Sequence, residues 1–229
     1  MRAILLPVKD LTNAKQRLAG VLTPKERFEL AHAMLADTAR AVSGVNQAER
    51  IFVVTNYAPV VRLAAENGWE VLWEDRQISE SHSVDAASRT CAERGITRLL
   101  RLPLDIPLVK SRDIDALLEI ECPSNAVVLV PSQDGTGTNA ILRCPPTLFP
   151  SHFGHGSFAK HRAEAERRGA QIIVCRNARL EIDVDSGEDL SLLVRHDLQG
   201  TATGQWLRES GVGARYLAEL ESRPAAAGS

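Results

Sequence analysis

The run Ala126-Val127-Val128-Leu129-Val130-Pro131 is followed by Asp134-Gly135-Thr136-Gly137-Thr138-Asn139 and then by Ala140-Ile141-Leu142. The two apolar runs predict strands, and the six residues between them carry no bulky side chain. Two glycines let the backbone take positive φ angles and approach a ligand closely. The hydroxyls, the amide and the backbone N–H groups offer donors to anionic oxygens. Asp-Gly is also common in hairpin turns, so this run alone fits either a plain turn or a phosphate site.

Upstream of this stretch, apolar strand-like runs alternate with helix-like segments. Thr23 is a suitable helix cap, and Pro24 suits the first helical position. The pattern predicts strands at 3–7, 51–55, 70–73 and 98–102, and helices at 24–42, 59–66, 84–94 and 111–119. This alternation is typical of an open, mostly parallel α/β sheet.

Downstream, the pattern changes to strand, turn, strand and then to further helices. Helices are predicted at 157–168, 188–195 and 203–210, and a strand at 171–175. With no internal repeat and no linker-like stretch, residues 1–220 are predicted to form a single α/β domain. Residues 221–229, rich in alanine, are predicted to be a disordered tail.

The bulk composition excludes several classes of protein. The 229 residues carry a net charge of −2, which disfavours sequence-independent nucleic-acid binding. No apolar run approaches the length of a membrane span, and the N-terminus has the character of a first strand and not of a signal peptide. Four scattered cysteines without a Cys-x-x-Cys pair predict reduced thiols in a cytoplasmic protein and disfavour a zinc site.

After the first predicted strand, a span of nine residues holds three cations: Lys9, Lys15 and Arg17. Ligands of open α/β sheets bind beyond the carboxyl ends of the strands. A polyphosphate would explain such a cluster, because each cation can neutralise a separate oxygen. A solvated basic loop is the alternative interpretation.

Three carboxylates form the second candidate set. Asp105 is the only charge in a segment bounded by two prolines at a strand end, where a buried carboxylate needs a partner. Asp183 and Asp185 share one side of an extended segment and would repel each other without a cation. Together the three predict an oxygen-rich Mg²⁺ site. Alternatively, Asp105 is a turn residue and Asp185 caps the following helix, with Glu188 completing the cap.

A third candidate site precedes the helix predicted at 157–168. Gly154, Gly156 and Ser157 lead into this helix, and backbone N–H groups at a helix N-terminus bind anions. His152 and His155 are expected to be polar loop residues and not a metal pair. The chain has no G-x-G-x-x-G, no G-x-x-x-x-G-K-[ST] and no G-x-S-x-G motif, which disfavours dehydrogenases, P-loop NTPases and serine hydrolases.

Taken in order, these motifs resemble the 2-phospho-L-lactate guanylyltransferase family, which includes phosphoenolpyruvate guanylyltransferases and acts in coenzyme F-420 biosynthesis. The resemblance covers about residues 1–195. It is carried by segments 7–9 and 14–18, by 134–139, by 153–158 and by 183–185, while Asp105-Ile106-Pro107 looks like the Asp-Leu-Pro of many nucleotidyltransferases. The resemblance implies a GT-A-like nucleotidyltransferase with an open, Rossmann-like mixed sheet and helices on both faces.

The resemblance also implies roles. Asp105, Asp183 and Asp185 would hold Mg²⁺, and Thr138, Gly154 and Ser157 would hold the acceptor phosphate. Lys9, Lys15 and Arg17 would meet the triphosphate of GTP, with Lys15 and Asp105 as the catalytic pair. Asp85 departs from the amide usual in the family and is expected to accept from the N–H donors of guanine.

The implied reaction transfers GMP from GTP to a phosphorylated three-carbon acid and releases pyrophosphate. The acceptor stays open among 2-phospholactate, phosphoenolpyruvate and 3-phosphoglycerate. The alternatives are a nucleotidyltransferase acting on a sugar phosphate or molybdenum cofactor, and a non-catalytic nucleotide-binding module. A homodimer is compatible with the sequence, and neither nucleic acid nor a membrane is expected as a partner.

Overall fold

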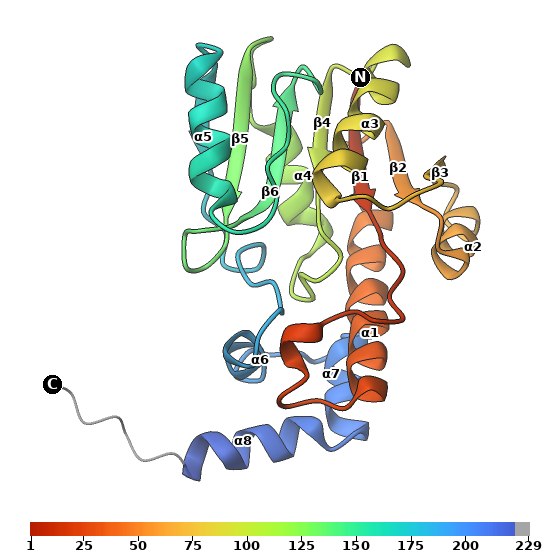
Figure 1. Ribbon diagram of the computed structural model, residues 1–229, viewed down its shortest axis with the longest axis vertical. Coiled ribbons are helices and arrows are strands. Elements are labelled where there is room, and N and C mark those ends of the chain that lie inside the picture. The colour runs from red at the N-terminus through yellow and green to blue at the C-terminus, as the bar shows by residue number, and fades with distance from the viewer. Residues whose placement is uncertain (223–229) are drawn as a thin grey trace, which may run out of the picture.

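Within residues 1–222, the part of the chain that the computed structural model describes, seven strands form one sheet in the order β3-β2-β1-β4-β6-β5-β7 (Figure 1). The strands are β1 (Arg2–Pro7), β2 (Arg50–Thr55), β3 (Glu70–Trp73), β4 (Arg98–Arg101), β5 (Ala126–Pro131), β6 (Thr138–Cys144) and β7 (Gln171–Val174). The pairs β1–β2, β1–β4, β2–β3 and β5–β7 are parallel, whereas β6 runs antiparallel to both of its neighbours. The sheet is therefore mixed, as predicted.

The helices follow the predicted alternation. They are α1 (Pro24–Ser43), α2 (Ala58–Glu66), α3 (Glu80–Glu93), α4 (Ser111–Glu119), α5 (Ser157–Arg167), α6 (Gly187–Leu193), α7 (Ala202–Glu209) and α8 (Val212–Ser222), with a short 3₁₀ turn at Gln16–Leu18. Thr23 caps α1 as predicted: its hydroxyl accepts from the Glu26 N–H at 3.2 Å, and the Glu26 carboxylate accepts from the Thr23 N–H at 2.7 Å.

Most observed boundaries lie within two residues of the predicted ones, and two larger differences stand out. Helix α3 starts four residues earlier than the predicted Val84, because Ser79 caps it by accepting from the His82 N–H at 3.1 Å. The polar residues 80–83 of its first turn gave no apolar periodicity. Helix α8 was not predicted and takes in residues 221 and 222 of the predicted tail. The rest of that tail, 223–229, lies outside the described residues.

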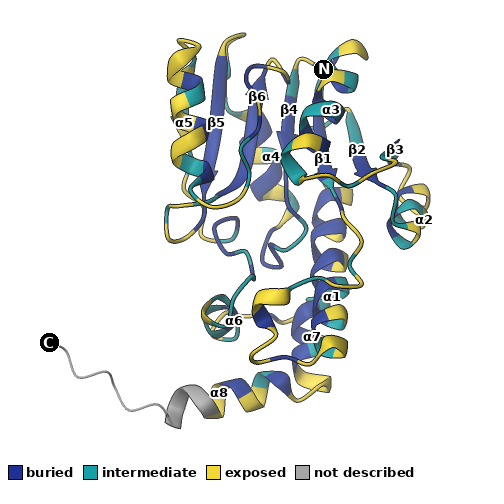
Figure 2. Ribbon diagram, in the orientation of Figure 1, coloured by how far each residue is buried: buried dark blue, intermediate teal, exposed yellow. Residues whose placement is uncertain are grey.

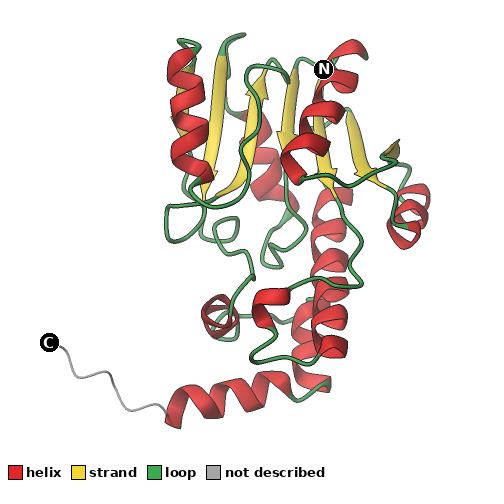
Figure 3. Cartoon of the chain, in the orientation of Figure 1, coloured by secondary structure: helices red, strands yellow, loops and turns green. Residues whose placement is uncertain are grey.

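Helices cover both faces of the sheet (Figure 3). Alternation along each strand sends one set of side chains to each face. On one face, residues such as Ile4 and Leu100 pack with α1, α2 and α4; on the other, Leu5 packs with α3, and Val127 packs with α5. The central strands β1, β4, β5 and β6 are almost wholly buried, as Figure 2 shows for β5 and β6, whereas the edge strands β3 and β7 include exposed residues.

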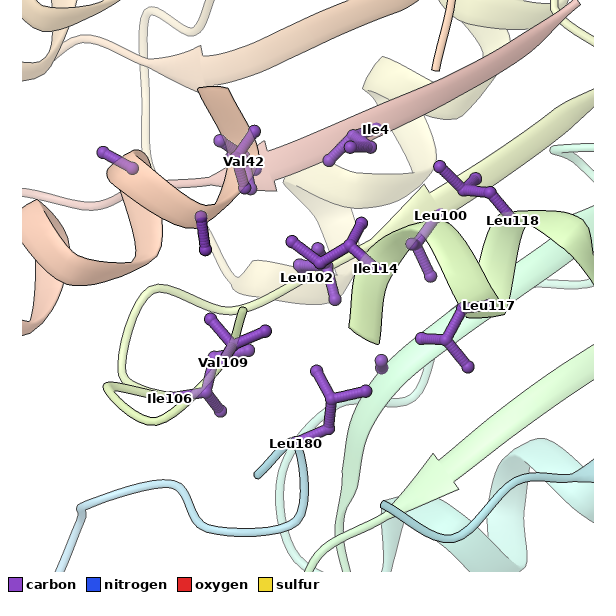
Figure 4. Close-up of a cluster of buried hydrophobic side chains, with 14 of the residues drawn as sticks. Ile4, Val42, Leu100, Leu102, Ile106, Val109, Ile114, Leu117, Leu118 and Leu180 are labelled. Carbon is purple, nitrogen blue, oxygen red and sulfur yellow. The ribbon is translucent and has the colours of Figure 1, made fainter. Parts of the chain in front are cut away.

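The first of these cores also fixes two loops that leave the sheet. Ile106 and Val109, in the loop between β4 and α4, and Leu180, in the segment after β7, point into the same cluster as Leu102 and Ile114 (Figure 4). Asp105 precedes Ile106, and Asp183 lies three residues after Leu180. Apolar packing thus holds the segments that carry two of the candidate carboxylates.

A further core lies beyond the carboxyl ends of the strands, where α6, α7 and α8 pack near α1 (Figure 1). Leu18, Ile182 and Val184 are buried in it, so it anchors the segments that carry Lys15 and Asp185. Asp37 of α1 binds the start of α7 by accepting from the Ala202 and Thr203 N–H groups at 2.7 and 2.8 Å. No helix within residues 1–222 is long and apolar enough to cross a membrane.

Candidate active site

Two adjoining cavities open where the parallel strands end. The first, here named the β1 cavity, has a volume of about 340 Å³ and is lined by the loop after β1 together with residues of β2 and α3. The second, the hairpin cavity, has about 660 Å³ and is lined by the β5–β6 turn, the loop before α5 and the segment 181–192. Five residues line both cavities: Glu80, Arg101, Pro103, Asp105 and Asp185. Both volumes lie within the range usual for small-molecule sites.

The side chain of Lys15 joins two of the predicted carboxylates where the cavities meet. Its ammonium donates to Asp105 Oδ2 at 2.7 Å and to Asp185 Oδ1 at 2.8 Å, and only 8% of the side chain is exposed. Burial on its own would lower the pKa of Lys15, but the two carboxylates outweigh it and raise that pKa. Lys15 therefore stays charged and offsets part of the negative charge of its two partners.

The third carboxylate, Asp183, lies close by and takes part in no ion pair within residues 1–222. One of its oxygens accepts from Asn139 Nδ2 at 3.1 Å. Burial, and then the negative charge of Asp105, raise the pKa of Asp183 to about 6. The cluster therefore carries more negative charge than Lys15 compensates.

Asp185 does not cap α6, which was the alternative role considered for it. Ser186 is the cap, and its hydroxyl accepts from the Asp189 N–H at 3.3 Å while the Asp189 carboxylate accepts from the Ser186 N–H at 2.7 Å. The Asp185 carboxylate instead forms ion pairs with Lys15, at 2.8 Å, and with Arg17, at 3.8 Å. A backbone bond from the Val184 N–H to the Asp105 carbonyl, at 3.2 Å, ties the two acidic segments together.

The donor chemistry of this cluster suits a divalent cation. Asp105 Oδ1 is buried and has no hydrogen-bond partner within residues 1–222. That orphaned oxygen and the uncompensated Asp183 are hard oxygen donors of the kind Mg²⁺ takes. The described residues nevertheless hold no ready-made group of three His, Cys, Asp or Glu ligands, and Lys15 already engages Asp105 and Asp185. A cation would thus need ligands beyond the protein, such as substrate phosphates.

The three predicted cations take different positions. Lys9 and Lys15 line the β1 cavity, and Arg17 lines the hairpin cavity. The Arg17 side chain is 75% exposed, in contrast to the buried Lys15. Lys15 also has φ of 57°, the single positive φ outside glycine among the described residues. Such strained backbone is tolerated where the surroundings dictate it and is frequent at functional sites.

The glycine-containing turn between β5 and β6 is stabilised by hydrogen bonds between its own residues. The Asp134 carboxylate accepts from the Thr136 N–H at 3.0 Å and from the Thr136 hydroxyl at 2.7 Å. The Gly137 N–H donates to Ser132 Oγ at 2.7 Å, and a Cβ at Gly137 would come within 2.9 Å of that oxygen. Glycine at 137 therefore allows the tight approach of Ser132, and the turn presents Thr138 at the start of β6.

The three residues predicted to bind the acceptor phosphate are brought together. Thr138, Gly154 and Ser157 all line the hairpin cavity, although they come from β6, a loop and α5. The Thr138 N–H donates to Ser157 Oγ at 2.8 Å. At the start of α5, the Ser157 and Phe158 N–H groups already donate to the Gly154 and Thr136 carbonyls, both at 3.1 Å. The helix N-terminus thus offers fewer free amides than the sequence led us to expect.

Asp85 is not brought to either cavity. Its carboxylate accepts from the Ser151 N–H at 3.0 and 3.1 Å and pairs with the buried Arg143 at 3.5 Å. The carboxylates of this region that do line the β1 cavity are Glu74 and Glu80. Glu80 lies on the first turn of α3, ahead of the helix start predicted at Val84.

Arg101 was also missed, because it lies within a strand. It is 6% exposed, donates to the Asn139 carbonyl at 3.0 Å, pairs with Glu80, and its guanidinium lies 4.2 Å from the centre of the Phe153 ring. Its Nε is buried without a partner among the described residues. A buried cation lining both cavities is suited to an anionic ligand.

Comparison with known proteins shows the family to which the chain belongs. The sequence profile of the family described as "Guanylyl transferase CofC like" matches residues 1–222. A phosphoenolpyruvate guanylyltransferase of Rubrobacter xylanophilus is 36% identical over 189 residues, which are 82% of this chain and 91% of the relative. A 2-phospho-L-lactate guanylyltransferase of Methanothermobacter thermautotrophicus is 32% identical over 90% of this chain and 89% of its own. A 3-phospho-D-glycerate guanylyltransferase of Phenylobacterium zucineum is 33% identical over 82% of this chain and 88% of its own.

The fold is likewise shared with a solved structure. A protein from Desulfovibrio desulfuricans, assigned as a nucleotide-diphospho-sugar transferase, superposes with a TM-score of 0.76 at 16% identity, over 93% of this chain and 96% of that one. This likeness establishes the α/β fold, and the sequence relatives establish the family. The chain belongs to the guanylyl transferase CofC-like family of nucleotidyltransferases.

Proposed function

We propose that this protein transfers GMP from GTP to a phosphorylated three-carbon acid and releases pyrophosphate, as a step of coenzyme F-420 biosynthesis. The observation that carries the proposal is the meeting of two cavities at one charged cluster, Lys15, Asp105 and Asp185. The β1 cavity would take the nucleotide and the hairpin cavity the phospho-acid. The names of the relatives support the same pair of substrates.

The chemistry needs little from acid–base groups. The phosphate of the acceptor is already anionic at neutral pH, so no general base has to activate it. An oxygen of that phosphate would attack the α-phosphorus of GTP in line while pyrophosphate leaves. The protein's task is to hold two polyanions together and to offset their repulsion, which it would do by positioning and by cationic charge.

Three cations are proposed for this task. Lys15 would hold Asp105 and Asp185 in place at the junction, and Lys9 would contact the triphosphate from the loop after β1. The exposed Arg17 lines the hairpin cavity and would reach the phosphates from its rim. Lys15, with its ammonium held by two carboxylates, acts here as an organiser of the acidic cluster more than as a direct phosphate ligand.

Mg²⁺ is the proposed cofactor, and Asp105 and Asp183 would hold it with Asp185 alongside. Its chemical contribution would be to neutralise charge on the transferred and leaving phosphates. The support is the orphaned Asp105 Oδ1 and the raised pKa of Asp183, at about 6.

For the base, we propose Glu74 in place of Asp85. Glu74 lines the β1 cavity and accepts from the Ser83 hydroxyl, whereas Asp85 is engaged by Ser151 and Arg143. A carboxylate accepts from the N–H donors on the edge of guanine, while the corresponding carbonyl of cytosine or uracil would be repelled. A preference for GTP follows from that contrast.

The experiment is a pyrophosphate-release screen of GTP, ATP, CTP and UTP against 2-phospholactate, phosphoenolpyruvate and 3-phosphoglycerate, with Mg²⁺ present. Release that requires both GTP and one of the three acids is the expected result. Glucose 1-phosphate serves as the control acceptor. Release with the sugar phosphate and with none of the acids would overturn the proposal.

A further inference from the structure

His161, on α5, is a fully buried side chain beside the hairpin cavity. It is 0% exposed and packs against the rings of Phe149 and Phe153, with ring centres 6.1 and 5.1 Å away. Burial, and then the positive charges of Arg143 and Arg101, lower the pKa of His161 to about 3. His152 and Lys160 add smaller effects of the same sign. The ring is therefore neutral at neutral pH.

The contacts of the ring determine which nitrogen carries the proton. The His152 N–H donates to Nε2 of His161 at 2.9 Å, so Nε2 must present a lone pair. In a neutral imidazole the other nitrogen then carries the hydrogen. That nitrogen, Nδ1, lies 3.0 Å from the hydroxyl oxygen of Thr138. His161 consequently donates to Thr138, and the hydroxyl of Thr138 acts as the acceptor.

The direction of the hydrogen bond between His161 and Thr138 determines which donors the hairpin cavity offers to a ligand. Thr138 and Ser157 both line it, and each hydroxyl oxygen accepts from a protein donor: Thr138 from His161, and Ser157 from the Thr138 N–H at 2.8 Å. Within residues 1–222, no hydrogen bond uses the hydrogen of either hydroxyl once the ring is the donor. Both hydroxyl hydrogens can then be donated to a bound anion. By contrast, the Ser157 and Phe158 N–H groups at the start of α5 already donate to backbone carbonyls.

We propose that His161 is a positioning residue that keeps the Thr138 hydroxyl pointed as a donor toward the phosphate of the acceptor. The same ring holds the His152 N–H, and with it the loop that carries Gly154, so one side chain fixes both sides of the phosphate site. This inference rests on the proposed function, since it assigns the phospho-acid to the hairpin cavity.

The tautomer can be measured in the free protein. Nitrogen-15 NMR of the imidazole rings at pH 7 and pH 5 distinguishes the two neutral tautomers from imidazolium, and the His161→Asn variant identifies the His161 signals among those of the six histidines. The expected result is a neutral ring with hydrogen on Nδ1 at both pH values. Hydrogen on Nε2, or a ring protonated at pH 7, would overturn the inference.

A double-mutant cycle tests the action through Thr138. With GTP and phosphoenolpyruvate, Thr138→Val and His161→Leu should each raise the KM for the acid by about tenfold, roughly the effect of one hydrogen bond to a charged group. The double variant should be no worse than Thr138→Val alone, and the KM for GTP should stay within about twofold. Losses that multiply in the double variant, or an equal rise in the KM for GTP, would contradict the inference.

His161→Asn supplies the conservative variant, because its side-chain amide keeps an N–H near the place of Nδ1. It should retain a KM for the acid below that of His161→Leu, and thermal unfolding shows whether both variants are folded.

If the wild type turned over none of the three phospho-acids, the proposed function would fail, while the NMR result would still stand. If turnover occurs and the cycle is additive, the proposed function stands and the role of His161 fails.

Discussion

Lys15 donates to Asp105 Oδ2 at 2.7 Å across ninety positions of the chain. The pair joins the loop after β1 to the loop after β4, at the line where the two cavities meet. Because Asp185 accepts from the same ammonium, one cation reduces the repulsion between two carboxylates and their repulsion of an incoming triphosphate.

Removal of this cation is expected to impair catalysis more than removal of its exposed neighbour. Lys15→Gln should lower kcat by about a hundredfold, because the junction loses its compensating charge. Arg17→Gln is the matched control, and because its contact is exposed and longer, at 3.8 Å, we expect a loss of less than about tenfold. Steady-state kinetics at low and high salt measure both. Equal losses in the two variants would contradict the distinct role of Lys15.

The metal assignment predicts that Asp183→Asn lowers turnover by about a hundredfold and shifts the Mg²⁺ dependence of the rate to higher concentration. Among the described residues Asp183 has no cationic partner, and the metal would supply the positive charge. Glu188→Gln, in the same cavity, should leave the Mg²⁺ midpoint within about twofold, because this exposed side chain is outside the proposed ligand set. If the Mg²⁺ dependence of Asp183→Asn equals that of the wild type, Asp183 is not a ligand of the metal.

Base selection should depend on Glu74 and not on Asp85. Glu74→Gln is expected to reduce the ratio of kcat/KM for GTP to that for CTP by about tenfold, the effect of one lost hydrogen bond to a charged group. Asp85→Asn should leave that ratio unchanged and lower the melting temperature, because its carboxylate binds the Ser151 N–H and Arg143. A changed ratio in Asp85→Asn would restore the original sequence prediction.

Acid should weaken the loop that precedes the acidic cluster. The buried Asp113 accepts from Arg179 Nε at 2.7 Å and from the Lys110 N–H at 3.0 Å; although burial opposes them, these bonds hold the pKa of Asp113 below its usual range. The unfolded chain binds the proton more readily, so this stabilisation is present above about pH 4 and is lost as pH falls through the folded pKa. Asp113→Asn should therefore unfold about 2–3 kcal/mol more easily at pH 7.

The measurement is urea unfolding of both proteins between pH 2.5 and 7. The difference between the two stabilities should narrow as pH falls below about 4, because the unfolded wild-type chain then takes up a proton and the contribution of the charged Asp113 carboxylate declines. A difference that persists undiminished at pH 2.5 would show that packing, and not the charge of Asp113, separates them.

Much of the fold was predictable because each strand contains a short apolar run and the first helix carries the Thr23 cap and Pro24. The boundary of α3 was not, because Ser79 provides a cap without any apolar periodicity after it. The late helix start also affects the predicted site. A helix that begins at Val84 excludes Glu80, which lines both cavities.

The candidate site followed from strand ends, which bring Lys15, Asp105 and the 183–185 segment together. The hydrogen bonds among these site residues could not be predicted from the sequence, because they depend on three-dimensional distances. Nothing in the spacing of Lys15, Asp105 and Asp185 indicates that one ammonium bonds to both carboxylates. Similarly, His161 is one polar residue within a helix, and its contact with Thr138 arises from the packing of α5 beside β6.

The central claim is that the phosphate of a three-carbon acid attacks the α-phosphorus of GTP. The most direct measurement is phosphorus-31 NMR of the products formed from GTP and each acid in the presence of Mg²⁺. The account predicts free pyrophosphate and a pair of coupled signals from a new unsymmetrical diphosphate that links GMP to the acid's phosphate. Pyrophosphate with free GMP and an unchanged phospho-acid, or a coupled product formed from CTP in preference to GTP, would contradict it.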